Sequence, residues 1–187
     1  SILNPIELFL PVQFIIKKSF IILLFIVFLF LPDKSYSNEK INDYGIIALM
    51  YHRFEENKYP STNIKISDFK MHLEMIKEEG FHFLNTNDFE EALKSNKNKK
   101  KILLTIDDGF LSFYQNAWPI LKSKRIPFIL FVSTREVGKY GYMTWDQINE
   151  LAKEDFVHIG NHSHTHEYLI DRSSEEIKKD LETSISI

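Results

Sequence analysis

Two clusters of polar side chains in this sequence could carry chemistry, and each follows an apolar run. The first is the carboxylate pair Asp107-Asp108, and the second is the stretch 160–166, which reads Gly-Asn-His-Ser-His-Thr-His. One carboxylate oxygen and two imidazole nitrogens are a usual ligand set for a hydrolytic metal ion that keeps a position open for water. A second carboxylate beside that set could accept a proton from the water. Together the clusters predict a site for metal-assisted hydrolysis.

Each cluster also has an ordinary structural interpretation when it is taken alone. Asp-Asp-Gly is a common turn sequence, in which Asp107 or Asp108 would cap the next helix. One helical turn would place His162 and His166 on the same side. An extended segment would instead align His162, His164 and His166 on one face. The spacing leaves both geometries of the histidine segment open, and only the presence of both clusters favours a common site.

Five apolar runs predict the strands that must position these residues, at 46–51, 81–84, 102–106, 127–132 and 156–159. Amphipathic segments alternate with them and predict helices at 68–79, 87–93, 112–123 and 144–152 and from 173 onward. This alternation predicts βαβ units and a parallel α/β sheet, either open or part of a barrel. His52, Asp107-Asp108 and His162 then follow three strand ends, where parallel folds gather functional residues.

Polar residues indicate where the helices begin. Ser67 is expected to cap the helix at 68–79, and the segment 51–66 is expected to be a loop because it contains Pro60 and Asn63. Capping boxes, in which two side chains satisfy each other's backbone N–H groups, are expected at Asn87/Glu90, Thr144/Gln147 and Ser173/Glu176.

Composition narrows the classes of function. The 187 residues carry a net charge of −3. This charge does not indicate the basic surface that a nucleic-acid partner requires. Cysteine is absent, and a metal site must therefore use histidine and carboxylate ligands. The content of 44% hydrophobic and 26% charged residues is that of a globular protein with a packed core.

The first 37 residues have the pattern of a segment that directs export. Lys17-Lys18 precede the apolar run 19–31, and Ser35-Tyr36-Ser37 offers small residues at the positions that a signal peptidase reads. The alternative is an uncleaved membrane anchor, although the run is shorter than the roughly 20 residues that span a bilayer. Residues 1–37 are therefore expected to be a signal peptide or N-terminal anchor. The protein is expected to be periplasmic or extracellular and to touch a membrane only through this segment.

The motifs resemble those of a known family. Thr-Ile-Asp-Asp-Gly at 105–109 resembles the Thr-Phe-Asp-Asp-Gly motif of the polysaccharide deacetylases (the NodB-homology domains, family four carbohydrate esterases), and 162–166 matches their His-Ser/Thr-x-x-His motif. The segments 49–54, 116–119 and 142–145 resemble the exported branch that removes acetyl groups from poly-N-acetylglucosamine. The resemblance extends over residues 46–169.

The resemblance implies a distorted (β/α) barrel over residues 38–187, incomplete at its C-terminus, that hydrolyses the N-acetyl groups of an acetylated amino-sugar polymer. It implies a divalent metal, usually zinc, with Asp108, His162 and His166 as ligands and Asp107 as the general base. We expect His52 on the substrate side of the site, or behind the ligands, with a structural histidine as the alternative. Trp145 is expected either to stack on a sugar ring or to pack against the barrel.

One expected part is missing from the sequence. The family takes its general acid from a Leu-x-Leu-His-like motif and shapes its substrate site with an Arg/Tyr-x-Pro-Tyr/Phe-like segment, and neither occurs after His166. The chain begins at Ser1 and ends within a helical pattern, so we expect a fragment. Two alternatives therefore stay open. The protein could be an inactive relic that binds metal or glycan, or it could deacetylate peptidoglycan, chitin or a non-sugar amide.

Overall fold

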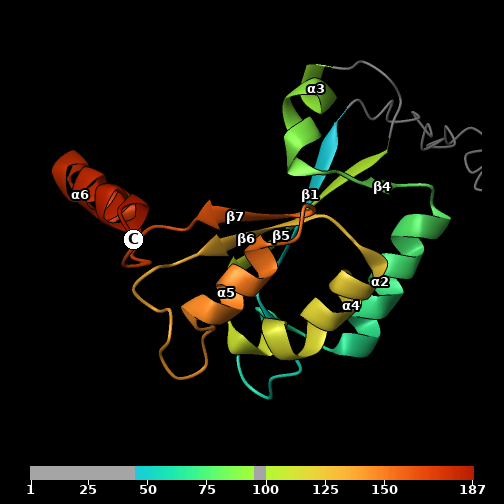
Figure 1. Ribbon diagram of the computed structural model, residues 1–187, viewed down its shortest axis with the longest axis horizontal. Helices are drawn as coiled ribbons and strands as arrows, with labels where there is room; N and C mark the ends of the chain where they lie inside the picture. Colours follow the sequence, from blue (N-terminus) through green and yellow to red (C-terminus); the bar gives the residue numbers. More distant parts are fainter. Residues whose placement is uncertain (1–44, 95–99) are drawn as a thin grey trace, which may run out of the picture. The chain divides into compact units, whose positions relative to one another are not determined.

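The computed structural model describes residues 45–94 and 100–187, so the predictions for residues 1–37 lie outside it. Its centre is a five-stranded parallel sheet in the order β1-β5-β6-β7, with β4 paired to the beginning of β5 (Figure 1). The strands are β1 (Ile46–Tyr51), β4 (His82–Phe83), β5 (Lys101–Asp108), β6 (Phe128–Val132) and β7 (Val157–Asn161). The prediction of five parallel strands is confirmed, with ends that agree within two residues.

The register of the sheet brings the functional strand ends level with one another. Asp108 is opposite Val132, and Val132 is opposite Asn161, so β5, β6 and β7 end together. His162 follows β7 directly. Because the strands are parallel, the loops that leave β1, β5 and β7 all emerge at the same edge of the sheet.

One face of the sheet carries the core. Figure 1 shows the helices α2 (Ile66–Glu78), α4 (Trp118–Lys124) and α5 (Trp145–Ala152) on the same side of the strands. Alternate residues of β5 and β6 point toward them and are buried with residues of these helices. The core includes Leu104, Ile106, Phe128 and Leu130 from the strands, and Phe69, Leu73, Leu121, Ile148 and Leu151 from the helices.

The opposite face of the sheet is partly open in the described part of the chain. Leu49 and Tyr51 of β1 pack against the core, whereas Met50 between them is 61% exposed. A doubly wound sheet has helices on both faces, while a barrel has them on the outside only. The sheet therefore has the architecture of an incomplete (β/α) barrel, as expected. None of the helices in the described residues is both long enough and apolar enough to cross a bilayer.

The segment after β1 is more ordered than predicted. Residues 51–66 contain two short parallel strands, β2 (Arg53–Phe54) and β3 (Asn63–Ile64), so the prediction of a simple loop is wrong. The side-chain amide of Asn63 donates to the carbonyl of Glu56 at 2.8 Å, and its side-chain oxygen accepts from the Glu56 N–H at 2.9 Å. These contacts close the segment on itself, and they depend on pairings that periodicity does not reveal.

Two helix starts differ from the predictions because another residue provides the cap. Ser67 lies inside α2, whose N-cap is Lys65, and the Glu55 carboxylate accepts from the Ile66 N–H. The predicted box at Asn87/Glu90 is also wrong. Asn85 caps a 3₁₀ turn (Thr86–Asp88), and α3 (Phe89–Lys94) follows it.

The boxes at Thr144/Gln147 and Ser173/Glu176 are confirmed at the starts of α5 and α6 (Ser174–Ile185), which follows the 3₁₀ turn Leu169–Asp171. The helix predicted at 112–123 is divided into a π-helical turn (Phe113–Ala117) and α4. Pro119 lies in the first turn of α4 and has no N–H for a regular bond to the preceding turn, which gives the reason for the division.

Candidate metal centre

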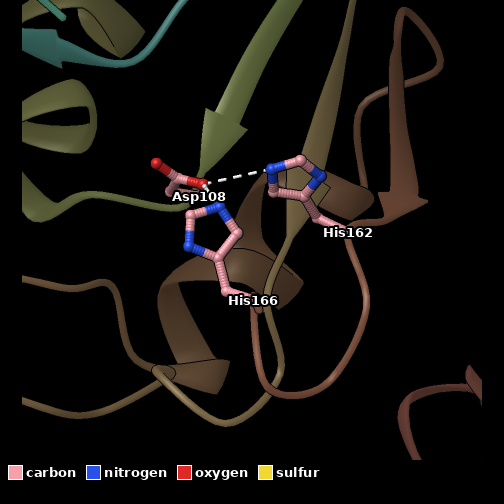
Figure 2. Close-up of side chains that lie close together, drawn as sticks. All are labelled: Asp108, His162 and His166. Atoms are coloured by element: carbon pink, nitrogen blue, oxygen red, sulfur yellow. Dashed lines mark ion pairs between the residues drawn. The ribbon is translucent and has the colours of Figure 1, made fainter. Parts of the chain in front are cut away.

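Asp108, His162 and His166 converge at the carboxyl edge of the sheet. Asp108 is the last residue of β5, while both histidines belong to the loop after β7. The Asp108 Oδ1 atom lies 3.2 Å from His162 Nε2 and 3.0 Å from His166 Nε2 (Figure 2). Each residue offers one ligand atom, and the three atoms lie within 4.8 Å of one another.

This arrangement fits a small divalent cation. Bonds of about 2.0–2.2 Å to a tetrahedral zinc ion place neighbouring ligand atoms about 3.3–3.5 Å apart, close to the separations from Asp108. The Asp108 Oδ1 atom is buried and accepts no well-aligned hydrogen bond, although both imidazoles point at it. A buried carboxylate oxygen without a donor is costly unless a cation satisfies it. One oxygen and two nitrogens are suitable ligands for zinc.

The backbone around these ligands is held in an unusual conformation. Asp108 and His166 both have positive φ values, of 72° and 57°, and Ser163 between the histidines has a φ of 66°. The left-handed region is uncommon for residues other than glycine, and strain of this kind gathers at functional sites. The histidine segment is therefore neither the helical turn nor the extended strand that its spacing allowed.

The two adjacent carboxylates have different electrostatic surroundings. Burial would raise the pKa of Asp108, but the imidazoles of His162 and His166 outweigh it and hold that pKa below its usual value. The Asp108 carboxylate in turn raises the pKa of His162, against the opposing effect of burial. Burial raises the pKa of Asp107 above its usual value, although His162 and His52 partly counter it. Asp108 thus favours the anionic form that a metal requires, and Asp107 is the better proton acceptor.

Asp107 lies beside the three converging residues and faces His52. Its Oδ2 atom is 4.0 Å from His162 Nε2 on one side and 4.0 Å from His52 Nε2 on the other. Its Oδ1 atom is buried without a hydrogen-bond partner. His52 follows β1, and its side chain is 19% exposed. The structure therefore brings together all four residues of the two motifs and adds His52 from a third strand end.

Trp145 and His164 lie outside this cluster. Trp145 is the first residue of α5 and is 39% exposed. The Met143 N–H, two residues earlier, donates to the Gly109 carbonyl at 2.9 Å, so this segment runs against the Asp-Asp-Gly turn. Stacking of Trp145 on a sugar stays a prediction. The His164 Nδ1 atom is 2.9 Å from the Thr134 hydroxyl, and His164 is not among the converging residues.

Asp180, which was not predicted from the sequence, lies on α6 and holds the loop that carries the two histidines. Its carboxylate accepts from the backbone N–H groups of His164 and Thr165 and from the Thr165 hydroxyl. Burial would raise the pKa of Asp180, but these hydrogen bonds outweigh it and hold that pKa below its usual value. The sequence signal was an acidic residue that helical spacing places on the same side as the apolar residues Ile177 and Leu181.

A further contact that was not predicted joins the segments after β1 and β5. The Arg53 guanidinium lies 3.5 Å from the centre of the Phe110 ring and 4.4 Å from that of Tyr59. It also pairs with Glu56 at 2.8 Å. Arg53 follows His52, and Phe110 is two residues after Asp108, so this contact joins two sides of the site.

Comparisons with known proteins agree with this geometry. The chain is 28% identical over 123 residues to YxkH of Bacillus subtilis, with 65% of this chain and 42% of that protein covered. It is 24% identical over 201 residues to a poly-beta-1,6-N-acetyl-D-glucosamine N-deacetylase of Staphylococcus aureus, with 90% and 69% covered. The structure of IcaB from Ammonifex degensii is similar with a TM-score of 0.67 and 25% identity, over 76% of this chain and 67% of that one.

These likenesses extend over only part of the relatives, since the chain spans less than half the length of the Bacillus protein. The model of one protein family, described as polysaccharide deacetylase, matches residues 94–187. That segment contains both the Asp-Asp pair and the two converging histidines. The fold, the motifs and the family match therefore agree, and the chain belongs to the polysaccharide deacetylase family.

Proposed function

We propose that this protein is a metal-dependent hydrolase that removes N-acetyl groups from an amino-sugar polysaccharide. The observation that carries the proposal is the convergence of Asp108, His162 and His166 with Asp107 beside them. A divalent ion held by these three residues, for which zinc is the best match, would supply a more acidic water and polarise the amide carbonyl. A cluster that combines a ligand set, buried carboxylates and solvent-accessible histidines supports hydrolysis better than structural metal binding.

Asp107 is the proposed general base. Its raised pKa makes it a stronger proton acceptor than an exposed carboxylate, and its Oδ2 atom lies 4.0 Å from the imidazole of His162. A proton acceptor next to the ligands can take a proton from an attacking water without itself binding the ion.

His52 is the proposed proton donor for the leaving amine. Its Nε2 atom lies 4.0 Å from Asp107 Oδ2, and it comes from a strand end other than those that carry the ligands. Departure of an amine requires a general acid, and histidine is the side chain that most often fills this role. The missing C-terminal histidine motif was the reason to consider an inactive relic. A donor from the first strand end would fill the same role.

The proposed substrate is a polymer of N-acetylglucosamine. Support comes from the relative in Staphylococcus aureus, whose name gives poly-beta-1,6-N-acetyl-D-glucosamine as its substrate. The pattern of residues 1–37 supports export of the protein from the cytoplasm.

The test is acetate release from N-acetylglucosamine oligomers by the zinc-loaded protein, compared with the variant Asp107→Asn. We expect the variant to lose at least about 100-fold in kcat, since positioned bases contribute about 10²–10⁴. Its zinc content, measured by elemental analysis, should stay at the wild-type level because Asp107 is not a ligand in this proposal.

Asp88→Asn is the matched control, because it removes an exposed carboxylate from the 3₁₀ turn before α3. It should keep the wild-type rate. Parallel assays with β-1,6-linked oligomers, with β-1,4-linked chitin oligomers and with peptidoglycan identify the preferred polymer. Equal rates for Asp107→Asn and the wild type would rule out this mechanism.

A further inference from the structure

We propose that Asp180 is a positioning residue of the metal centre, which presets His162 and His166 for the ion by holding the loop between them. The inference rests on the metal site of the proposed function, but it does not depend on which substrate the site hydrolyses. It concerns α6, an element that carries none of the ligands.

The hydrogen bonds of Asp180 fall on the two residues just before His166. Its Oδ2 atom accepts from the His164 N–H at 2.8 Å, and its Oδ1 atom accepts from the Thr165 N–H at 2.9 Å. The Thr165 hydroxyl also donates to Oδ1 at 2.7 Å. A carboxylate accepts all three bonds because both of its oxygens are acceptors, and charge-assisted bonds of this kind are stronger than neutral ones.

A second residue of α6 holds the other end of the loop. Ser184 lies four residues after Asp180, and therefore on the same side of the helix. Its Oγ atom accepts from the side-chain amide of Asn161 at 2.5 Å, and Asn161 Oδ1 accepts from the Ser163 N–H at 2.7 Å. One side of α6 thus contacts the loop on both sides of Ser163.

Among the described residues, α6 contributes little to the hydrophobic core. Its single buried residue is Ser184, and Asp180, Ile177 and Leu181 are half-buried beside it. In Figure 1 the helix stands apart from α2, α4 and α5, which cover the sheet. The side of α6 that faces the loop presents a buried serine and a half-buried carboxylate. Its position is therefore better explained by its effect on the loop than by apolar packing.

The loop needs such support because its conformation is strained. Ser163 and His166 both have positive φ values, and the residues held by Asp180 lie between them. Strained conformations persist only where the surroundings fix them. The opposite side of the loop is held by the backbone N–H of Arg135, which donates to the His164 carbonyl at 3.1 Å, and by the Thr134 N–H, which donates to the Ser163 carbonyl at 3.3 Å. Asp180 therefore supplies the charged hydrogen bonds on one side of the loop, and backbone N–H groups supply the neutral ones on the other.

The test is the affinity of the full chain for Zn²⁺ alone, measured by competition with a chromogenic chelator. Asp180→Asn has the same shape as the wild type but turns an N–H₂ group toward a backbone N–H. We expect its dissociation constant for Zn²⁺ to rise about 10–100-fold, the usual effect of losing a partner behind a metal ligand. Thr165→Val removes only the hydroxyl bond and should produce a smaller increase.

Glu182→Gln is the matched control, because it removes an exposed carboxylate from the same helix, where its ion-pair partner is Lys178 at 3.7 Å. Its affinity for Zn²⁺ should equal that of the wild type. A purely structural role would lower the unfolding temperature of zinc-free Asp180→Asn and leave its Zn²⁺ affinity unchanged, and that result would overturn the inference. A wild-type protein that binds no Zn²⁺ would overturn the metal site as well. Zinc binding without acetate release would overturn only the proposed activity.

Discussion

At the scale of single residues, two neighbouring aspartates are given opposite properties by their surroundings. Asp108 contacts two imidazoles, which hold its pKa below the usual value, whereas burial dominates at Asp107 and raises its pKa. In a regular strand the two side chains would point to opposite faces, but Asp108 has a positive φ, and both carboxylates lie within 4.0 Å of His162 Nε2. A ligand and a base can therefore come from consecutive residues.

His52 provides a prediction at this scale. We expect His52→Gln to lower kcat for acetate release by about 10²–10⁴, the usual contribution of a positioned acid, and to change the KM and the zinc content little. Steady-state kinetics and elemental analysis provide the two readouts. His82→Gln, which changes an exposed histidine of β4, is the control and should have wild-type kinetics. A higher KM at unchanged kcat would instead identify His52 as a substrate-binding residue, the role expected from the sequence.

At the scale of elements, β6 and β7 fit together through a glycine. A Cβ atom on Gly160 would lie 2.5 Å from Phe131 Cδ1, so the aromatic ring occupies the space of the missing side chain. The same ring lies 6.2 Å from the imidazole of His162, measured between ring centres. Gly160 therefore allows Phe131 to pack beside a metal-ligand candidate.

We expect Gly160→Ala to lower the free energy of unfolding by about 1–3 kcal/mol, because overpacking forces the ring or the strand to move. Urea denaturation monitored by circular dichroism measures this loss. The double variant Gly160→Ala/Phe131→Leu should recover part of it, since leucine lacks the outer ring atoms. Additive losses in the double-mutant cycle would exclude the contact as the cause.

Most elements with a local signal could be predicted from the sequence, although the cap at Asn85 was missed, and contacts with distant partners could not. The five strands are short apolar runs, and the boxes at Thr144 and Ser173 are closed within four residues. The start of α2 depends on Glu55, eleven residues before Ile66, and periodicity does not reveal this pairing. The site follows the same rule. The motifs identified its four central residues, whereas Asp180 contributes through contacts that exist only in the folded chain.

At the scale of the whole molecule, the site is assembled from three strand ends that are far apart in the sequence. His52, Asp108 and His162 follow or end β1, β5 and β7, and they meet only when the sheet has formed. An ion that binds the assembled site binds the native state more tightly than the unfolded chain. Its binding energy therefore adds to the stability of the fold.

Export is a prediction that concerns the complete chain. We expect the full-length protein, expressed in a bacterial host, outside the cytoplasm. It should lack residues 1–37 if this segment is a signal peptide and retain them if it is an anchor. Cell fractionation followed by N-terminal sequencing distinguishes these outcomes. Leu24→Arg, which interrupts the apolar run, should keep the protein in the cytoplasm, and a cytoplasmic wild type would contradict the prediction.

The contact of Arg53 with Phe110 has a consequence for the order of events at the site. It joins the residue after His52 to the turn after Asp108, and an arginine keeps its charge at every physiological pH. The contact therefore helps to fix the spacing between the proposed acid and base. Geometry fixed in advance does not have to be created during the reaction, so binding energy from the polymer remains available to lower the barrier itself.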